Sequence, residues 1–98
     1  MNQLSIILAL AMLLLAQSVA SAQERARTVE QYACKDVMRE RGADRDVAIA
    51  FLHGFLLGKS GSSKFDLQNL YKQSDAFIER CLENPAEPAV EAMIKVKN

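Results

Sequence analysis

Cys34 and Cys81 are the only cysteines in this chain of 98 residues. If the chain is exported to an oxidising compartment, two cysteines leave a single intramolecular disulfide to form. In the chain-entropy treatment, closing a loop of about 48 residues stabilises the fold by about 4 kcal/mol. That is comparable to the whole stability expected of so small a domain. A metal pair or a reactive thiol has no support, because there is no CxxC motif and His53 is the only histidine.

The N-terminal segment indicates export. Residues 1–22 contain no charged side chain, whereas residues 23–98 hold all twelve Lys and Arg and all twelve Asp and Glu. An apolar run leads into small residues at Ala20 and Ala22, which is the pattern of a secretory signal peptide. We therefore predict cleavage between Ala22 and Gln23, so that residues 23–98 form the mature domain. This makes the Cys34–Cys81 disulfide an expected structural element.

A membrane anchor is the alternative interpretation of the same segment. Its apolar run covers residues 4–16 and is broken only by Ser5. As a helix it would rise only about 20 Å, against a hydrocarbon core of about 30 Å. We therefore expect no membrane span after processing.

The mature domain is predicted to be all-α, with four helices. No segment alternates apolar and polar residues with period two, as a half-buried strand would. Apolar residues recur instead at intervals of three and four, between residues that favour helix ends. The helices are predicted to start after Thr28, Asp44 and Asp66 and at Pro88, and the first three to end near Gly42, Gly58 and Asn84.

Some local signals refine these boundaries. Gln31 lies three residues after Thr28 and would complete a capping box at the first helix. Gly42 suits the left-handed position that follows a helix. Ser74 and Asp75 favour caps over helix interiors, so an interruption of the third helix is considered there.

The second predicted helix is apolar nearly all round. From Val47 to Gly58 it carries no acidic or basic residue except His53. A helix of this kind is buried on more than one side, so its additional apolar face should meet other helices or another subunit. We predict that this face forms a homodimer contact at neutral pH, made by Val47, Phe51, Leu52 and Phe55.

Gly54 and Gly58 lie one turn apart on this helix, and each destabilises a helix by about 1 kcal/mol relative to Ala. One interpretation is that they form a flat groove for helix packing, where another backbone approaches closely. The other is that Gly58 ends the helix and Gly54 relieves crowding near Phe51 and Phe55. The sequence does not separate the two.

The sequence contains no recognisable set of catalytic residues. His53 lies within an apolar helix, where a packing role is commoner than catalysis. The formal net charge is +0, and no stripe of Lys and Arg suggests nucleic acid as a partner. We therefore expect neither an enzyme nor a cofactor.

Three blocks of the chain, YACKDVM at residues 32–38, AFLHGFLLGKSG at residues 50–61 and FIERCLENP at residues 77–85, together resemble the HdeA/HdeB acid-stress chaperone family. The family opening, aromatic-x-Cys-x-(Asp/Glu)-apolar-apolar, is similar to YACKDVM at residues 32–38. The helix W-L-x-G-Y-x-x-G-K of its HdeA-like branch resembles AFLHGFLLGKSG at residues 50–61. The ending F-x-x-x-C-x-x-N-P resembles FIERCLENP at residues 77–85. The blocks occur in the family order and include both cysteines.

This resemblance implies a periplasmic protein of a Gram-negative bacterium, with one disulfide and a dimer near neutral pH. In acid, such a protein would dissociate, loosen and shield unfolding periplasmic proteins without ATP. Two other functions stay open on the sequence alone. One is an immunity or inhibitor protein that neutralises a secreted effector enzyme, and the other is a structural module of an envelope complex.

Overall fold

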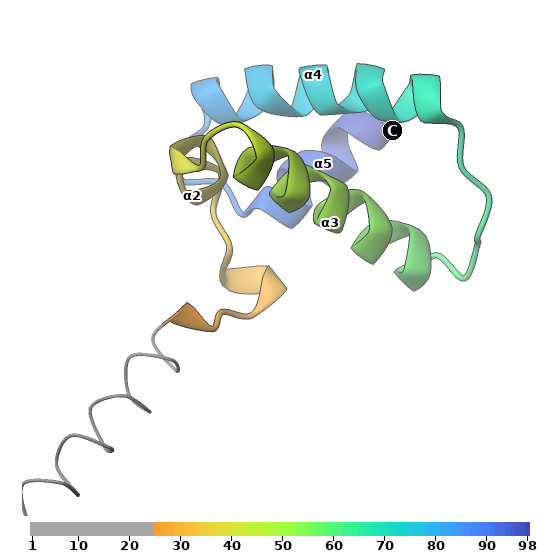
Figure 1. The fold of residues 1–98 in the computed structure, drawn as a ribbon, viewed down its shortest axis with the longest axis horizontal. Coiled ribbons are helices and arrows are strands. Elements are labelled where there is room, and N and C mark those ends of the chain that lie inside the picture. The colour runs from red at the N-terminus through yellow and green to blue at the C-terminus, as the bar shows by residue number, and fades with distance from the viewer. Residues whose placement is uncertain (1–24) are drawn as a thin grey trace, which may run out of the picture.

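The computed structural model describes residues 25–98, so the predicted signal peptide and its cleavage between Ala22 and Gln23 lie outside the described residues. Figure 1 shows a bundle of four α-helices preceded by a short 3₁₀ turn. This part of the chain contains no strand, only one isolated bridge between Ala33 and Pro88. The all-α prediction with four helices is confirmed. The elements are η1 (Val29–Gln31), α2 (Cys34–Arg39), α3 (Ala43–Lys59), α4 (Leu67–Glu83) and α5 (Ala89–Lys97).

The first helix is shorter than predicted and starts later. Thr28 precedes only the 3₁₀ turn, and its side chain makes no capping hydrogen bond. The predicted capping box with Gln31 is therefore wrong. Helix α2 begins at Cys34 instead, where Asp36 Oδ2 accepts a hydrogen bond from the Ala33 amide over 3.2 Å. A carboxylate at this position accepts a hydrogen bond from an amide that has no partner within the helix. Its negative charge also interacts favourably with the positive end of the helix dipole.

Helix α3 begins one residue before the predicted cap. Gly42 occupies the N-cap with a φ of 51°, a left-handed backbone that glycine adopts without steric penalty. Asp44 therefore lies inside the first turn, together with Asp46. The negative charges of both side chains interact favourably with the positive end of the helix dipole.

Helix α4 begins as predicted, because Asp66 Oδ1 accepts hydrogen bonds from the amides of Gln68 and Asn69. The interruption considered at Ser74 and Asp75 is absent, and α4 is continuous from Leu67 to Glu83. Ser74 is accommodated because its hydroxyl donates back to the Leu70 carbonyl over 2.7 Å.

The core is small and receives side chains from all four helices. Helix α5 contacts α2, α3 and α4, and α2 contacts both long helices. Helices α3 and α4 approach each other less closely, and they diverge toward the connector at residues 60–66 (Figure 1). The buried apolar residues are Cys34, Val37, Ile49, Leu52, Phe77, Cys81, Ala89, Ala92 and Met93.

The predicted disulfide is present and joins α2 to α4, with 4.9 Å between the Cα atoms of Cys34 and Cys81. The same end is also held by the backbone. The amide of Cys34 donates to the Glu87 carbonyl over 2.8 Å, and the amide of Ala89 donates to the Tyr32 carbonyl over 2.8 Å. The chain before α2 is thereby fixed to the loop before α5. We call this region the disulfide end of the bundle.

Candidate functional site

Three apolar side chains form a line along the exposed side of α3. Val47, Phe51 and Phe55 are four residues apart, a spacing that places them on one face of a helix. Val47 is 68% exposed, Phe51 is 51% exposed, and Phe55 is partly buried. The two aromatic rings have centroids 6.4 Å apart. We call these three residues the α3 stripe.

Leu52 does not belong to this surface, although it was predicted there. Its side chain is fully buried in the core. Successive residues of a helix are about 100° apart, so the neighbour of an outward-facing Phe51 can point into the bundle. The prediction for Leu52 is corrected by this burial.

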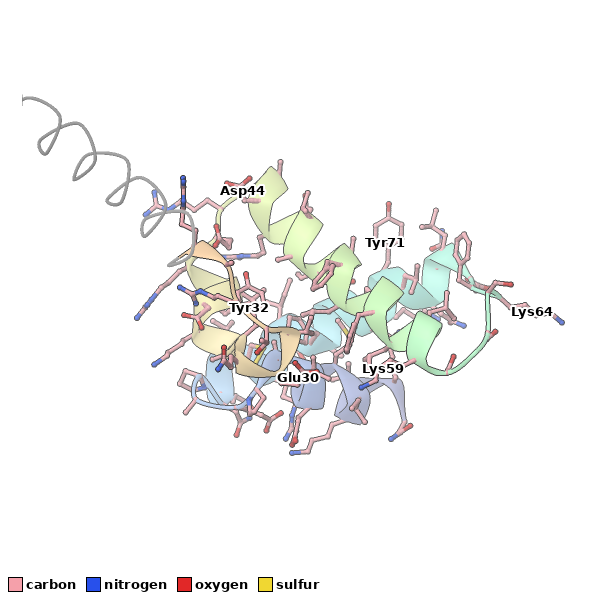
Figure 2. The ribbon with its side chains drawn as sticks, turned by 90° about the horizontal axis from the view of Figure 1, so that it is seen from below. Glu30, Tyr32, Asp44, Lys59, Lys64 and Tyr71 are labelled. Atoms are coloured by element: carbon pink, nitrogen blue, oxygen red, sulfur yellow. A yellow bond between two sulfur atoms is a disulfide. The ribbon has the colours of Figure 1, made fainter. Side chains whose placement is uncertain are left out.

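The stripe borders a shallow groove of about 710 Å³ between α3 and the segment that precedes α2. Its apolar part includes Val29, Tyr32 and Ala48. Figure 2 shows Tyr32 and Asp44 at the same end of the molecule, where α3 begins. The charged lining is balanced between three arginines and three carboxylates, namely Arg25, Arg27, Arg39, Asp36, Glu40 and Asp44.

A cation lies at the other end of the stripe. The Lys59 ammonium lies 5.0 Å from the centre of the Phe55 ring, at the C-terminal end of α3 (Figure 2). This distance is within the range of a cation–π interaction. Charged side chains therefore lie beyond both ends of the α3 stripe.

Gly54 and Gly58 do not support helix packing within the described chain. Both are exposed, and a Cβ atom added at either would meet nothing within 4 Å. This excludes a close approach of another backbone to either glycine, and crowding of Gly54 by Phe51, among the described residues. Gly58 does not end the helix either, since α3 continues to Lys59.

A second, larger groove separates α3 from α4 and has a volume of about 890 Å³. We call it the α3–α4 groove. Its α3 wall includes Leu56 and Leu57. On the opposite side lie three strongly exposed apolar side chains, Phe65, Leu67 and Tyr71.

Leu67 and Tyr71 follow the three- and four-residue spacing of apolar residues that predicts the buried face of α4, yet both side chains are exposed. The periodicity identifies that face correctly, yet it cannot show where the covering helix stops. Lys97, at the end of α5, reaches only to Gln73, where its ammonium donates to the side-chain oxygen over 2.7 Å. The first turns of α4, which precede Gln73, therefore lie beyond the part of α4 that α5 reaches.

His53 lies in this groove but is almost completely buried, with 6% of its surface exposed. Its Nε2 is 2.9 Å from the hydroxyl of Ser74, whereas its Nδ1 is buried without a hydrogen-bond partner in the described chain. Burial lowers the pKa of His53 to about 4, with a further contribution from the positive charge of Lys97. The imidazole is therefore neutral at pH 7.

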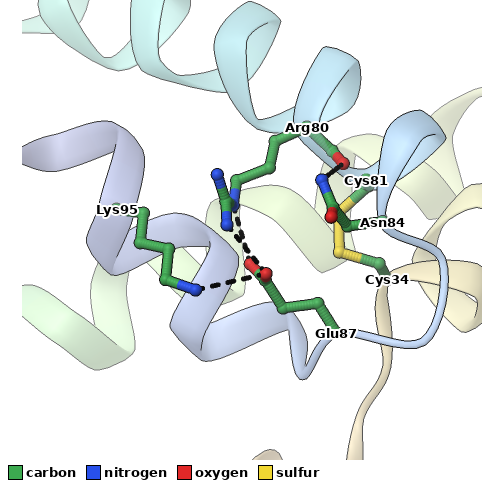
Figure 3. Close-up of polar contacts among 6 residues, drawn as sticks. All are labelled: Cys34, Arg80, Cys81, Asn84, Glu87 and Lys95. Carbon is green, nitrogen blue, oxygen red and sulfur yellow. Dashed lines mark hydrogen bonds and ion pairs between the residues drawn. A yellow bond between two sulfur atoms is a disulfide. The ribbon is translucent and has the colours of Figure 1, made fainter.

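Figure 3 shows an ion-pair network beside the disulfide. Arg80 donates two hydrogen bonds to the Glu87 carboxylate, from Nε to Oε1 over 2.7 Å and from Nη2 to Oε2 over 2.8 Å. Lys95 adds a third contact to Oε2 over 3.3 Å. The two hydrogen bonds from Arg80, and to a smaller extent the one from Lys95, lower the pKa of Glu87 to about 2. Its carboxylate therefore keeps its charge in moderately strong acid.

Within residues 25–98, no group of three or more His, Cys, Asp or Glu side chains could hold a metal ion. No helix in the same region is both long enough and apolar enough to span a bilayer.

Comparison with known proteins adds a family match. The HdeA/HdeB family model matches residues 5–90. The match covers most of the chain and includes both cysteines, the α3 stripe and His53. No curated protein and no solved structure shows significant similarity to the chain.

Proposed function

Because the chain belongs to the HdeA/HdeB family, we propose that it is an acid-stress chaperone that binds acid-unfolded proteins. Family membership supports a periplasmic, chaperone-like role at the family level. In the proposed mechanism, a neutral dimer dissociates in acid and exposes apolar surface to its clients. The observation that carries this proposal is the exposed α3 stripe of Val47, Phe51 and Phe55.

The chemistry around the stripe supports a second copy as its occupant at neutral pH. A contiguous exposed apolar patch marks a surface that another molecule covers. In a two-fold dimer each surface meets its own copy, so an adjoining rim must be self-complementary. The three arginines and three carboxylates beside the stripe meet this requirement, because opposite charges can face each other across the axis.

The same rim supports dissociation in acid. At pH 2 to 3 most carboxylates are protonated, while arginines keep their charge. The rim would then be dominated by Arg25, Arg27 and Arg39 on both copies, which repel one another. The side-chain charge of the whole chain would approach about +13, from its twelve Lys and Arg and His53. Such repulsion destabilises compact states, and the disulfide limits how far the chain expands.

Light scattering of an acid-sensitive client at pH 2 to 3 tests the function. The wild type should suppress aggregation at a few-fold molar excess, and Phe51→Asp should suppress it at least twofold less at equal concentration. Leu82→Asp is the matched control, because Leu82 is 67% exposed but lies outside both grooves. It should behave like the wild type.

Sedimentation at pH 7 and tens of micromolar completes the test. The wild type should be a dimer and Phe51→Asp a monomer, since a charge buried in the contact is strongly unfavourable. No suppression of aggregation by the wild type would contradict the chaperone function. Equal loss in Phe51→Asp and Leu82→Asp would contradict the role of the stripe.

A further inference from the structure

One side-chain hydrogen bond joins α3 to α4 across their groove. It connects His53 to Ser74 and is the only hydrogen bond between these two helices in the described chain. Helices α3 and α4 diverge toward the connector and approach each other less closely than the other helix pairs, so few direct contacts between them accompany this hydrogen bond. The bond is therefore well placed to control the separation of α3 from α4.

The protons of this contact can be assigned from its partners. The Ser74 hydroxyl has one proton, which it donates to the Leu70 carbonyl over 2.7 Å. Its oxygen must then accept from His53, so the Nε2 atom carries the imidazole proton. This leaves Nδ1 as a bare, buried acceptor with no donor nearby. A second proton would have to add at Nδ1, where the described chain provides no acceptor for it.

The charged groups around His53 do not favour that second proton. Lys97 from α5 raises the positive potential at the imidazole. Asp46 on α3 and Asp75 on α4 line the same groove, but they are exposed and form no ion pair with His53. Lys64 and Asp66, both in the connector, also line the groove. The cation would thus be buried and without a counterion.

We propose that His53 and Ser74 form an acid-sensitive latch, whose protonation releases α3 from α4 and opens the α3–α4 groove while the disulfide end stays folded. The opened groove would expose additional apolar side chains, including Leu56, Leu70 and Ile78. Its use for client binding rests on the proposed function, but the opening itself does not.

The direction of the pH effect follows from the two states of the imidazole. In the closed latch the pKa of His53 is about 4, and a solvated histidine in the open state has a pKa near 6.5. The open state therefore binds more protons between these values. Opening becomes more favourable as the pH falls from about 6.5 to about 4, by up to about tenfold per pH unit. Below about pH 4 the effect no longer increases.

The disulfide end responds differently. Its Cys34–Cys81 bond does not titrate, and the carboxylate of Glu87 keeps its charge at pH 3 because its pKa is lowered to about 2. The ion pairs of Glu87 with Arg80 and Lys95 therefore persist under conditions in which the latch is protonated. Opening at one end and retention at the other follow from the placement of these groups.

Amide hydrogen exchange followed by NMR tests the latch on the oxidised protein without any client. In the wild type, protection factors in the C-terminal half of α3 should fall at least tenfold more than those around Arg80 between pH 6.5 and 4. His53→Gln keeps a possible donor to Ser74 but does not titrate, and His53→Leu removes both properties. In both variants, the protection factors of α3 should decrease about as little as those around Arg80. Protection at pH 6.5 shows whether each variant is folded.

Two results would overturn the latch. One is an equal fall in the wild type and in a folded His53 variant, since carboxylates would then account for the opening. The other is an equal loss of protection in α3 and at the disulfide end, which would indicate global unfolding. A protein that shows the latch but fails to suppress aggregation would refute the proposed function and leave the latch standing.

Discussion

Glu87 is the carboxylate that the fold most clearly stabilises in its charged form. The paired hydrogen bonds from Arg80, with the contact to Lys95, lower its pKa from 4.5 to about 2. A group with a depressed pKa contributes stability that is present in full above the unfolded value. That contribution declines as the pH falls from about 4.5 toward 2.

Replacement of Glu87 should therefore have an effect that depends on pH. Glu87→Gln should lower the melting temperature by several degrees at pH 7, and the difference from the wild type should shrink progressively between pH 4.5 and 2. Glu91→Gln is the control, because Glu91 is exposed on α5 and forms no ion pair in the described chain. A difference that is constant with pH would show that the charge of Glu87 is not the cause.

The assignment of single side chains to a surface was only partly predictable. The sequence of α3 is apolar around nearly its whole circumference, so it gives no direct sign of which side chains face the bundle. Phe51 and Leu52 are adjacent and equally apolar, yet one is half exposed and the other is buried. The difference arises from where α2 and α5 pack against α3, which is tertiary information. Leu52 was assigned wrongly for this reason.

Helix α3 contributes a capping side chain that the sequence did not reveal. Arg45 donates from Nη2 to the Met38 carbonyl over 2.7 Å and from Nε to the Glu40 carbonyl over 3.1 Å. Carbonyls at the end of a helix lack partners within it, and a cation there also favours the negative end of the dipole. Arg45 therefore connects α3 to the end of α2.

Loss of this connection should destabilise the protein moderately. Arg45→Gln should reduce the free energy of unfolding by about 1 to 2 kcal/mol, because two hydrogen bonds from a charged group are lost. Chemical denaturation of the variant measures the change. Arg41→Gln removes a neighbouring exposed cation that makes no hydrogen bond in the described chain, and it should change stability by less than about 0.5 kcal/mol. Equal effects of the two substitutions would argue against the cap.

The existence of the helices was more predictable than their ends. Apolar periodicity predicted all four, and the cap at Asp66 is local enough to be recognised in the sequence. The start of α2 was missed because its amides bond to distant carbonyls, as when the Cys34 amide donates to that of Glu87. Ser74 was considered a helix interruption because serine favours caps over helix interiors, but its hydroxyl donates to the Leu70 carbonyl within α4 and the helix continues.

The disulfide should matter to the stability of the whole fold, because the buried core of residues 25–98 contains only nine apolar residues. Cys34→Ser, Cys81→Ser and the double variant should each lose about 4 kcal/mol of unfolding free energy, since each reopens the same loop. Urea denaturation of the three variants against the oxidised wild type measures this loss. If the single variants differed strongly from the double variant, the loop would not be the common cause.

The α3 stripe is proposed to contact a second copy at neutral pH and an unfolded client in acid. A photoactivatable phenylalanine derivative in place of Phe51 measures this directly. Crosslinks should join two copies at pH 7 and join the protein to the client at pH 3. The same group in place of Leu82, which lies away from the α3 stripe, should give few crosslinks at either pH. If position 51 gave no crosslinks to the client at pH 3, or no more than position 82, the α3 stripe would not be the client-binding surface.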